Sequence, residues 1–309
     1  MEFKHISVLK QESIDGLNIR PDGFYVDCTT GGAGHSYEIA KQLTAGRLIC
    51  FDKDTDALTF AKEKLKPFEG KVTFVNENFA DIDTVLDELG IDGVDGILAD
   101  LGVSSYQIDT ASRGFSFKHD ARLDMRMNKS QQLDAEYVVN NYSEEELSRI
   151  LFMYGEEKNA RQIARKIVKL REKQPITTTF QLRDIIVSSY PPKFQNKPSL
   201  CNKAFQAIRI EVNNELNDLP ISIEKMLRKL KKGGRICIIT FHPLEDRIVK
   251  NAFKLHSTNC ICPPRIPMCV CKHKADVTLI TRHPIIPSEN ELLSNSRSAS
   301  AKLRIVEKL

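Results

Sequence analysis

The sequence has no apolar run that approaches the ~20 residues needed to cross a membrane as a helix. Its first five residues, MEFKH, lack the apolar segment of a secretory signal. No internal repeat or low-complexity segment is present. These absences exclude a helical membrane protein, and we expect a cytoplasmic chain with no membrane partner.

The charge balance is not extreme in either direction. A net charge of +4 and a pI near 8.5 permit binding to nucleic acid without requiring it. The eight cysteines are expected to be reduced thiols, because the sequence predicts a long mixed α/β protein that is not secreted. With 309 residues, it can form one large domain or two smaller ones.

A glycine-rich segment, DCTTGGAGHS at 27–36, directly follows the apolar run 23–26. This pattern predicts a strand, a tight turn and then a helix, with glycine where the backbone must approach a ligand closely. A second predicted strand, 47–51, is followed by Asp52. An acidic side chain at that point can accept both hydroxyls of a ribose. The two features together predict a site for a nucleoside-containing cofactor.

What the glycine-rich segment lacks narrows the choice of cofactor. His35 and Ser36 stand where a P-loop would have Lys and Ser or Thr. Tyr37 stands where a dinucleotide fingerprint would have its third Gly or Ala. No pyrophosphate cradle is therefore predicted, and S-adenosylmethionine, which has no phosphate, fits better. The alternative is an ordinary turn, which Asp52 at the end of the next strand makes less favourable.

Strands and helices alternate through the first hundred residues. The pattern predicts strands at 23–28, 47–51, 72–75 and 94–99, and helices near 34–43, 55–66 and 81–89. Such alternation is typical of a doubly wound parallel sheet, whose ligands lie beyond the carboxyl ends of the strands. Residues 31–35, Asp52, Phe79 and Asp100 all fall there.

The next convincing strand, 235–241, begins 135 residues after Asp100, far more than one crossover needs. The intervening segment predicts helices at 142–154, 159–173, 180–188 and 203–219. We therefore expect a cofactor-binding domain at 1–107 and 216–309, interrupted by a helical domain at 108–215.

The helix predicted at 159–173 is basic. Its cations are Arg161, Arg165, Lys166, Lys169, Arg171 and Lys173. They form either a solvated face or a surface that contacts phosphates. The position of the insert next to the cofactor edge favours phosphate contact.

Several motifs, in their order along the chain, closely resemble those of the ribosomal RNA small subunit methyltransferase H family, also called MraW. They are DLGVSSYQ at 100–107, RGFSF at 113–117, LDMRM at 123–127, YGEE at 154–157, FQAIRI at 205–210, LEDR at 244–247 and SASAKLR at 298–304. The resemblance extends over essentially the whole chain. It implies a Rossmann-like class I S-adenosylmethionine-dependent methyltransferase sheet at 1–107 and 216–309, with an inserted helical substrate-recognition domain at 108–215.

The resemblance also implies the reaction: S-adenosyl-L-methionine is used to methylate N4 of one cytidine in the decoding centre of 16S rRNA. The partner would be 16S rRNA within the small ribosomal subunit, and the chain could form a homodimer. The implied cofactor-binding residues are Ala33, Gly34, His35, Asp52, Phe79, Asp100 and Gln107. No metal ligand is among them.

Each implied residue has a role and, for some, a simpler alternative. The amides of residues 33–35 would face the methionine carboxylate, with Gln107 at the same end of the cofactor. Phe79 would stack on adenine or be a core aromatic. His35 would bind the cofactor or merely neighbour a helix cap. Asp100 is the expected acceptor for the amine proton, and Ser104 is a weaker candidate.

Two positions depart from the family pattern. Tyr106 and Pro243 stand where the family usually has Pro and Ser, which affects substrate positioning more than cofactor contacts. Two other functions stay open: a methyltransferase with a different substrate, and a ribosome-assembly factor that uses the cofactor structurally. Nucleoside analysis separates the first, and absence of methyl transfer despite cofactor binding would favour the second.

Four cysteines, at 260, 262, 269 and 271, lie within twelve residues, and His256 and His273 flank them. They suggest a small zinc knuckle, although Cys-x-Cys is tighter than the usual Cys-x₂₋₄-Cys spacing. The alternative is a reduced surface loop stiffened by the prolines between the pairs.

Overall fold

The computed structural model describes residues 7–197, 199–263 and 268–309. The chain divides into two compact units, Met1–Gly102 with Leu216–Leu309, and Val103–Glu215. We call them the sheet unit and the helical unit. Their first boundary lies five residues before the expected 107/108, and their second lies at 215/216. The first five residues, in which no secretory signal was expected, and residues 264–267 of the proline-rich segment between the cysteine pairs lie outside the described residues.

The sheet unit is built on one seven-stranded sheet. Its strands are β1 (Phe24–Asp27), β2 (Arg47–Phe51), β3 (Val72–Val75), β4 (Val94–Asp100), β5 (Leu230–Thr240), β6 (Val277–Leu279) and β7 (Lys302–Lys308). Their order across the sheet is β3-β2-β1-β4-β5-β7-β6. Strands β1 to β5 pair in parallel, as the alternation of strands and helices predicts. The carboxyl ends of these five strands therefore share one edge.

The other end of the sheet departs from the expectation of a purely parallel arrangement. Strand β7, the last element of the chain, inserts between β5 and β6 and runs antiparallel to both. Its interior residues are buried, so it closes the core at this end.

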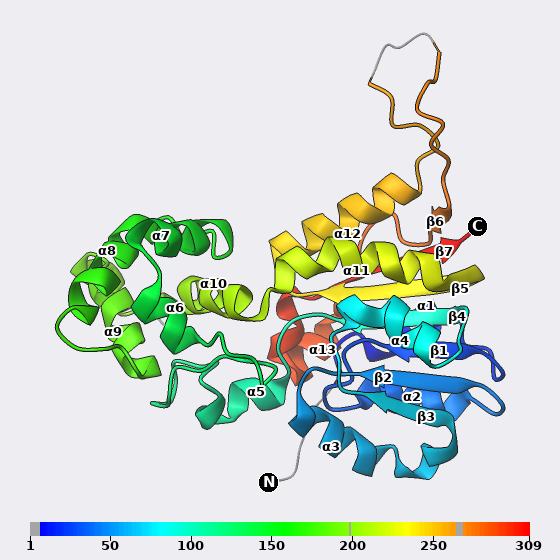
Figure 1. Ribbon diagram of the computed structural model, residues 1–309, viewed down its shortest axis with the longest axis horizontal. Helices are drawn as coiled ribbons and strands as arrows, with labels where there is room; N and C mark the ends of the chain where they lie inside the picture. Colours follow the sequence, from blue (N-terminus) through cyan, green and yellow to red (C-terminus); the bar gives the residue numbers. More distant parts are fainter. Residues whose placement is uncertain (1–6, 198, 264–267) are drawn as a thin grey trace. The chain divides into compact units, whose positions relative to one another are not determined.

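Helices cover both faces of the sheet. They are α1 (Lys10–Leu17), α2 (Gly34–Gln42), α3 (Thr55–Lys64), α4 (Ile82–Glu88), α11 (Glu215–Lys229), α12 (Pro243–His256) and α13 (Glu289–Ser294), with 3₁₀ turns η1 (Lys66–Lys71), η2 (Phe79–Asp81) and η5 (Ser296–Ser300). The core on one face includes side chains of α4, α11 and α12. The core on the other face includes side chains of α1, α2 and α3. Figure 1 shows α11 and α12 on one side of the strands and α2 and α3 on the other.

The central strands explain why the sheet forms without a ligand. Val26, Ile97 and Ile238 have no exposed surface, and each lies on a strand with neighbours on both sides. Apolar, β-branched residues suit strands that are buried on both faces. The edge of the sheet where these strands end is therefore held in place by a packed core.

The helical unit consists of short helices with a separate core. They are α5 (Ser105–Asp109), α6 (Ala135–Asn141), α7 (Glu144–Met153), α8 (Ala160–Arg171), α9 (Thr179–Ser188) and α10 (Asn202–Asn213), with η3 (Ala111–Arg113) and η4 (Pro192–Phe194). Leu147, Ile163, Leu182 and Ile208 are fully buried in this core.

One helix prediction was wrong. The helix expected at 203–219 is two helices, because Asn214 adopts φ 52° and ends α10. Asparagine is among the residues that best tolerate this left-handed conformation. Helix α11 then begins at Glu215 and continues to Lys229. Across the residues that the structure describes, no helix is both long and apolar enough to span a bilayer.

Candidate functional site

Ionisable side chains gather where the parallel strands end. We call this group the rim, and its members are Asp27, His35, Asp52, Asp100, His242 and Glu245, all in the sheet unit. Asp27 and Asp100 are the last residues of β1 and β4, and Asp52 directly follows β2. Three of these six residues, His35, Asp52 and Asp100, were predicted from the sequence to bind the cofactor.

The glycine-rich loop is fixed to the strand ends by backbone bonds. The Thr30 amide donates to the Phe51 carbonyl at 3.0 Å. Gly31 has φ 46°, a conformation that glycine adopts without strain. A Cβ on Gly34 would lie 1.8 Å from the Ser7 hydroxyl, so only glycine fits there.

Ala33 caps helix α2 in the left-handed conformation, with φ 51°. Its amide donates to the Thr30 carbonyl at 2.6 Å. This amide is therefore engaged inside the loop, although Ala33 is one of the residues expected to face the cofactor. That role stays a prediction for the amides of Ala33, Gly34 and His35.

Asp52 links the loop to β2. One carboxylate oxygen accepts from the Gly31 amide at 2.8 Å, and the other accepts from the Asp54 amide at 2.9 Å. Burial raises the pKa of Asp52 to about 6, against these two hydrogen bonds, which lower it. Each oxygen retains a second lone pair. The carboxylate can therefore accept hydroxyl donors while it holds the loop.

Asp100 is the rim carboxylate with a buried, unpartnered oxygen. Its amide donates to the Thr29 hydroxyl at 2.6 Å, which fixes the backbone. Its Oδ1 atom is buried and has no hydrogen-bond partner within the described chain. Burial, reinforced by the charges of Asp27 and Glu245, raises the pKa of Asp100 well above its usual value. An acceptor left in this state is suited to a ligand that brings a hydrogen-bond donor.

His35 stands beside Asp100 rather than on the surface. Its side chain is buried, and Nε2 lies 3.1 Å from the Val8 carbonyl oxygen. The other ring nitrogen, Nδ1, lies 3.9 Å from Asp100 Oδ2. The imidazole therefore lies between the Val8 carbonyl and the Asp100 carboxyl group, and its role in cofactor binding stays a prediction.

Phe79 opens the short turn η2 after β3. Its ring is partly buried and packs against the core beneath α4 and α11. Because the burial is partial, part of its surface stays accessible. The core contact and the stacking role expected from the family are therefore compatible.

Ser104 and Gln107 belong to the helical unit and form the cap of α5. The Ser104 hydroxyl accepts from the Gln107 amide at 3.2 Å, and Gln107 Oε1 accepts from the Ser104 amide at 3.0 Å. This is a capping box, whose Ser-x-x-Gln signature is readable in the sequence. The capping box explains why the two side chains face each other's backbone amide. Their catalytic and cofactor-binding roles stay predictions. Tyr106 lies within the same helix, and Pro243 takes the first position of α12, where proline is favoured.

Three rim residues were not named as site residues from the sequence. Asp27 is buried, accepts from the Ser36 hydroxyl and from the Thr29 amide, and has its pKa raised by burial to about 6. Its position at the end of a parallel strand, next to the glycines, was the available signal.

His242 and Glu245 follow β5 and complete the rim. Glu245 Oε2 accepts from the amides of Phe241 and His242 at 2.9 and 3.3 Å. His242 Nε2 lies 3.0 Å from Glu245 Oε1, and its buried ring nitrogens make no well-aligned hydrogen bond to a described residue. The LEDR motif contains Glu245, but only the fold brings it to the rim.

The rim thus combines several buried carboxyl groups with close backbone approach at Gly34. Carboxylates can accept hydrogen bonds from hydroxyl and amine donors and balance a positive charge. The orphaned Asp100 oxygen and the open acceptor sites of Asp52 fit a nucleoside that carries a cationic tail. The glycine-rich loop carries no lysine that would suit a pyrophosphate.

Comparisons with known proteins agree along the whole length. The model of the MraW methylase family matches residues 2–309. Three curated proteins named ribosomal RNA small subunit methyltransferase H are similar to this chain over its entire length: those of Lachnospira eligens (55% identical), Finegoldia magna (53%) and a strain of Clostridium botulinum (56%). The alignments cover 99%, 100% and 100% of those proteins.

Proposed function

Because the chain belongs to the MraW methylase family, we propose that it methylates N4 of one cytidine in the decoding centre of 16S rRNA. The chain is a methyltransferase that uses S-adenosyl-L-methionine. When bound, this cofactor supplies an electrophilic methyl group on a positively charged sulfur. The observation that carries the proposal is the buried, unpartnered Oδ1 of Asp100 at the end of β4.

Different rim residues would bind different parts of the cofactor. Asp52 would accept the ribose hydroxyls, and Phe79 would pack on the adenine. The amides at the start of α2 would face the methionine carboxylate, because a helix N-terminus favours negative charge. The acidic rim would offset the positive charge of the cofactor, and Gln107 is proposed for the methionine end.

The substrate amine requires an acceptor. An exocyclic cytosine amine is a poor nucleophile, because its lone pair is delocalised into the ring. As N4 forms its bond to carbon, it must lose one proton. Asp100 is proposed to accept that proton, with Ser104 as a weaker candidate. Its raised pKa makes the ionised carboxylate a better base than an ordinary aspartate. The Val8–His35 contact would keep the carboxyl in place.

Recognition of the RNA is proposed for the helical unit. On α8, Arg161 and Lys169 are exposed, and neutralisation of phosphates dominates affinity for nucleic acid. Two other cations of the helix have structural tasks: Lys166 Nζ donates to the Ser188 carbonyl at 2.6 Å, and Arg171 donates to the Val139 carbonyl at 2.8 Å. The target base must also leave its stack to be methylated.

The proposal is tested by incubating the full-length protein with isotope-labelled S-adenosylmethionine and small ribosomal subunits that lack the modification. Mass spectrometry of the RNA nucleosides should show labelled N4-methylcytidine. The matched control is a subunit that already carries the methyl group, which should take up no label. Label in another nucleoside or in protein would contradict the proposed substrate, and cofactor binding with no transfer would support an assembly factor instead.

A further inference from the structure

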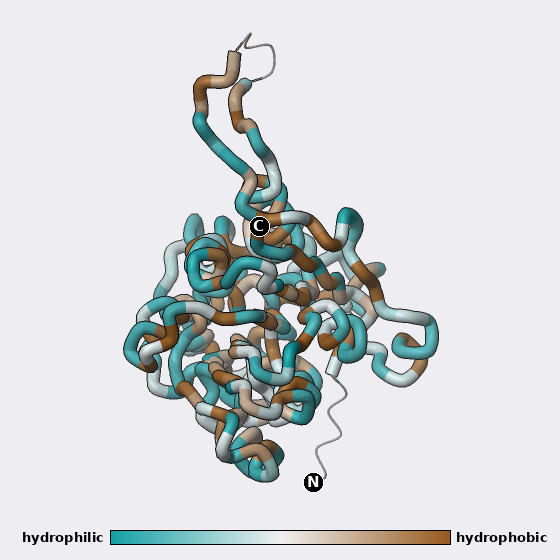
Figure 2. The backbone as a smooth tube through the Cα atoms, turned by 90° about the vertical axis from the view of Figure 1, so that its right-hand side faces the viewer, coloured by the Kyte–Doolittle hydropathy of each residue, from teal (hydrophilic) through white to brown (hydrophobic). Residues whose placement is uncertain are grey.

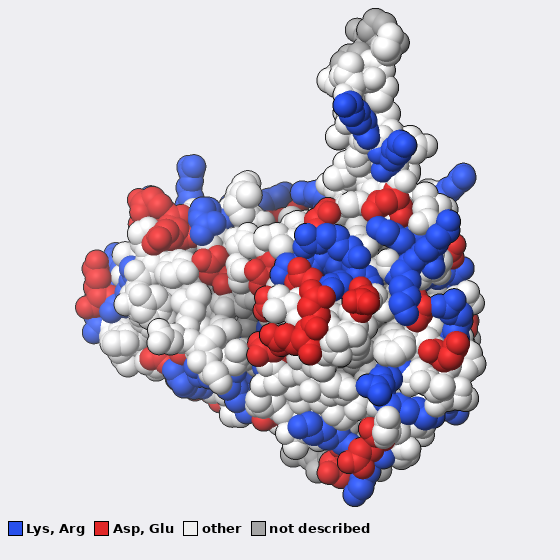
Figure 3. Space-filling model, turned by 45° about the vertical axis from the view of Figure 1, so that its right-hand side comes forward, with Lys and Arg blue, Asp and Glu red and all other residues white. Residues whose placement is uncertain are grey.

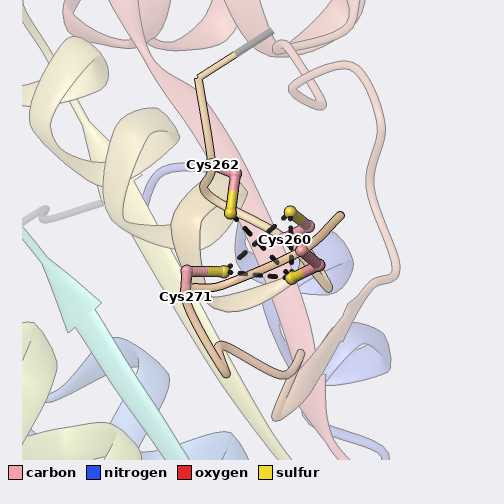
Figure 4. Close-up of side chains that lie close together, drawn as sticks. Cys260, Cys262 and Cys271 are labelled. Atoms are coloured by element: carbon pink, nitrogen blue, oxygen red, sulfur yellow. Dashed lines mark hydrogen bonds between the residues drawn. The ribbon is translucent and has the colours of Figure 1, made fainter. Parts of the chain in front are cut away.

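The loop between α12 and β6 brings four thiols together. We call them the thiol cluster: Cys260, Cys262, Cys269 and Cys271. All four sulfur atoms lie within 4.8 Å of one another. The pairs 260–269, 269–271, 262–269 and 260–271 are 3.5, 3.6, 3.9 and 3.9 Å apart. Figure 4 shows the sulfurs turned toward one another from two facing arms of the loop.

These distances match a metal cage. Four sulfurs placed tetrahedrally at about 2.3 Å from a zinc ion are about 3.8 Å from each other. A disulfide would require about 2.05 Å, and all eight cysteines are free thiols. The tight Cys-x-Cys spacing is therefore no obstacle, because Cys269 and Cys271 already span one tetrahedral edge.

The backbone supports the sulfurs in a nearly symmetric way. The Ile261 amide, in the middle of the first Cys-x-Cys, donates to Cys271 Sγ at 3.4 Å. The Val270 amide, in the middle of the second, donates to Cys262 Sγ at 3.4 Å. Amide donors to sulfur stabilise negative charge on a thiolate and orient it as a ligand. Each arm thus supports a ligand of the other.

In the described part of the loop, no packed core holds the two arms together. Ile261, Met268 and Val270 are 52%, 77% and 69% exposed, and Figure 2 shows the loop extending from the rest of the sheet unit, with apolar residues on both arms. Ordering a chain segment costs conformational entropy that buried apolar surface usually offsets. Here the sulfurs are the groups that face inward. A bound ion would offset this cost, because in small metal sites the free energy of metal binding drives folding.

The neighbouring histidines are already engaged elsewhere. His256 contacts Asp276 Oδ1 through Nδ1 and Glu224 Oε1 through Nε2, both at 2.8 Å. His273 Nε2 contacts the Leu255 carbonyl at 3.0 Å. These contacts fix the base of the loop and leave the ligand set as four sulfurs.

The local charge suits an anionic site. Four thiolates around a divalent ion carry a net charge of about −2. Among the described residues of 257–275, the charged side chains are Lys272 and Lys274, both exposed. On the face that Figure 3 shows, the coloured side chains on the loop above its base are basic.

We propose that the thiol cluster binds one Zn²⁺ ion in a closed tetrahedral site. Because all four ligands come from the protein, no coordination position is open for substrate or water. The ion therefore orders the loop and takes no part in methyl transfer. Among the described residues, the thiol cluster is the one group of metal-ligating side chains that converges in this way.

Elemental analysis of the untagged full-length protein, purified without added metal or chelator, should find about one zinc per chain. Cys260→Ser/Cys271→Ser should lower this to less than about a tenth. The matched control is Cys201→Ala, which removes a buried thiol outside the loop and should retain the metal.

Thiol titration of the native protein adds a readout independent of metal content. The cluster thiols should react with a thiol reagent only after a chelator is added, and reduced apo-protein should take up about one Co²⁺ with the absorption of tetrahedral thiolate coordination. Less than about a tenth of an equivalent of zinc, with all four thiols reactive and no metal taken up on addition, would overturn the site. Iron in place of zinc would overturn the identity of the ion. Both outcomes are independent of methyl transfer, so they leave the proposed function intact.

Discussion

The rim and the loop that carries the thiol cluster both bring reactive side chains together, but different forces hold them. Rim residues stand at the ends of strands whose interiors, such as Val26 and Ile97, are fully buried. The thiols stand on a loop whose apolar side chains Ile261 and Val270 are exposed. The rim is therefore pre-organised before its ligand binds, whereas the loop depends on its ion. Ligand removal should accordingly affect the two regions very differently.

The charged groups of the two regions also differ in environment. Burial raises the pKa values of Asp27 and Asp52 to about 6, and it raises the pKa of Asp100 well above its usual value. The fold thus supplies the free energy that holds carboxyl groups away from water, and a ligand with donors and positive charge relieves this cost. In the loop, the chain supplies donors to sulfur but no buried surroundings.

The largest effect should come from the rim residue that has the least satisfied oxygen. Asp100→Asn removes the proposed proton acceptor and keeps the shape of the side chain. We expect turnover to fall about 10²- to 10⁴-fold, with a much smaller change in cofactor affinity. Single-turnover methyl transfer and calorimetric titration of the cofactor measure the two. Equal losses in both would make Asp100 a binding residue only.

The electrostatic cost of the rim can be tested through Asp27. Because folding raises its pKa from 3.8 to about 6, its protonated form stabilises the native state below about pH 4. That contribution is lost as the pH rises through about 6, up to about 3 kcal/mol. Asp27→Asn stays neutral and should gain stability relative to wild type, by up to this amount, between pH 4.5 and pH 7. Urea unfolding at the two pH values measures it.

The matched control for this comparison is Asp22→Asn, which replaces an exposed carboxylate on the same strand–loop unit. It should retain the pH dependence of the wild type. If Asp27→Asn retains it as well, the rim carboxylate is not a source of this dependence.

A smaller loss is expected at the cofactor ribose. Asp52→Ala should weaken S-adenosylmethionine binding about 10- to 100-fold, since a charge-assisted hydrogen bond contributes about 1.5–3 kcal/mol. The same change also removes the acceptor of the Gly31 amide. Glu63→Ala, an exposed carboxylate on α3, is the control and should bind normally. An unchanged dissociation constant in folded Asp52→Ala protein would move the ribose site elsewhere.

We expect the affinity for RNA to depend on the exposed cations of α8 and not on the rim or the thiol cluster. Arg161→Ala/Lys169→Ala should weaken binding to small-subunit RNA and reduce the slope of log affinity against log salt by about 1.4–1.8, at about 0.7–0.9 per lost phosphate contact. Cofactor affinity should not change. An unaltered salt slope would assign these side chains to a solvated face, the alternative that the sequence left open.

The smallest effect on cofactor binding is expected when the thiol cluster is removed. Cys260→Ser/Cys271→Ser should leave the cofactor dissociation constant within about twofold, because the rim stands on the sheet core. Hydrogen exchange of the described amides in 257–276 should become faster in the same protein. Loss of cofactor binding together with loop protection would show that the two regions are coupled.

Much of the site was readable from the sequence because its signals are local. The glycine-rich segment 27–36 and the acids after strands two and four needed only strand–helix alternation to place them at one edge. The motif resemblance then supplied the family, which the comparisons confirmed. The break at Asn214 was missed, because the apolar pattern continues through it and one left-handed residue ends α10.

The order of elements and the position of Asp52 and Asp100 at strand ends were thus determined by the sequence alone, since parallel strands place their carboxyl ends together. Tertiary structure decided the rest. The insertion of β7 between β5 and β6 depends on pairing between distant segments. The raised pKa of Asp100 depends on burial and on Glu245, which follows another strand. Four neighbouring thiols are visible in the sequence, but only the folded loop brings their sulfurs to tetrahedral distances. The reason is that the neighbours of a side chain depend on the path of the whole chain.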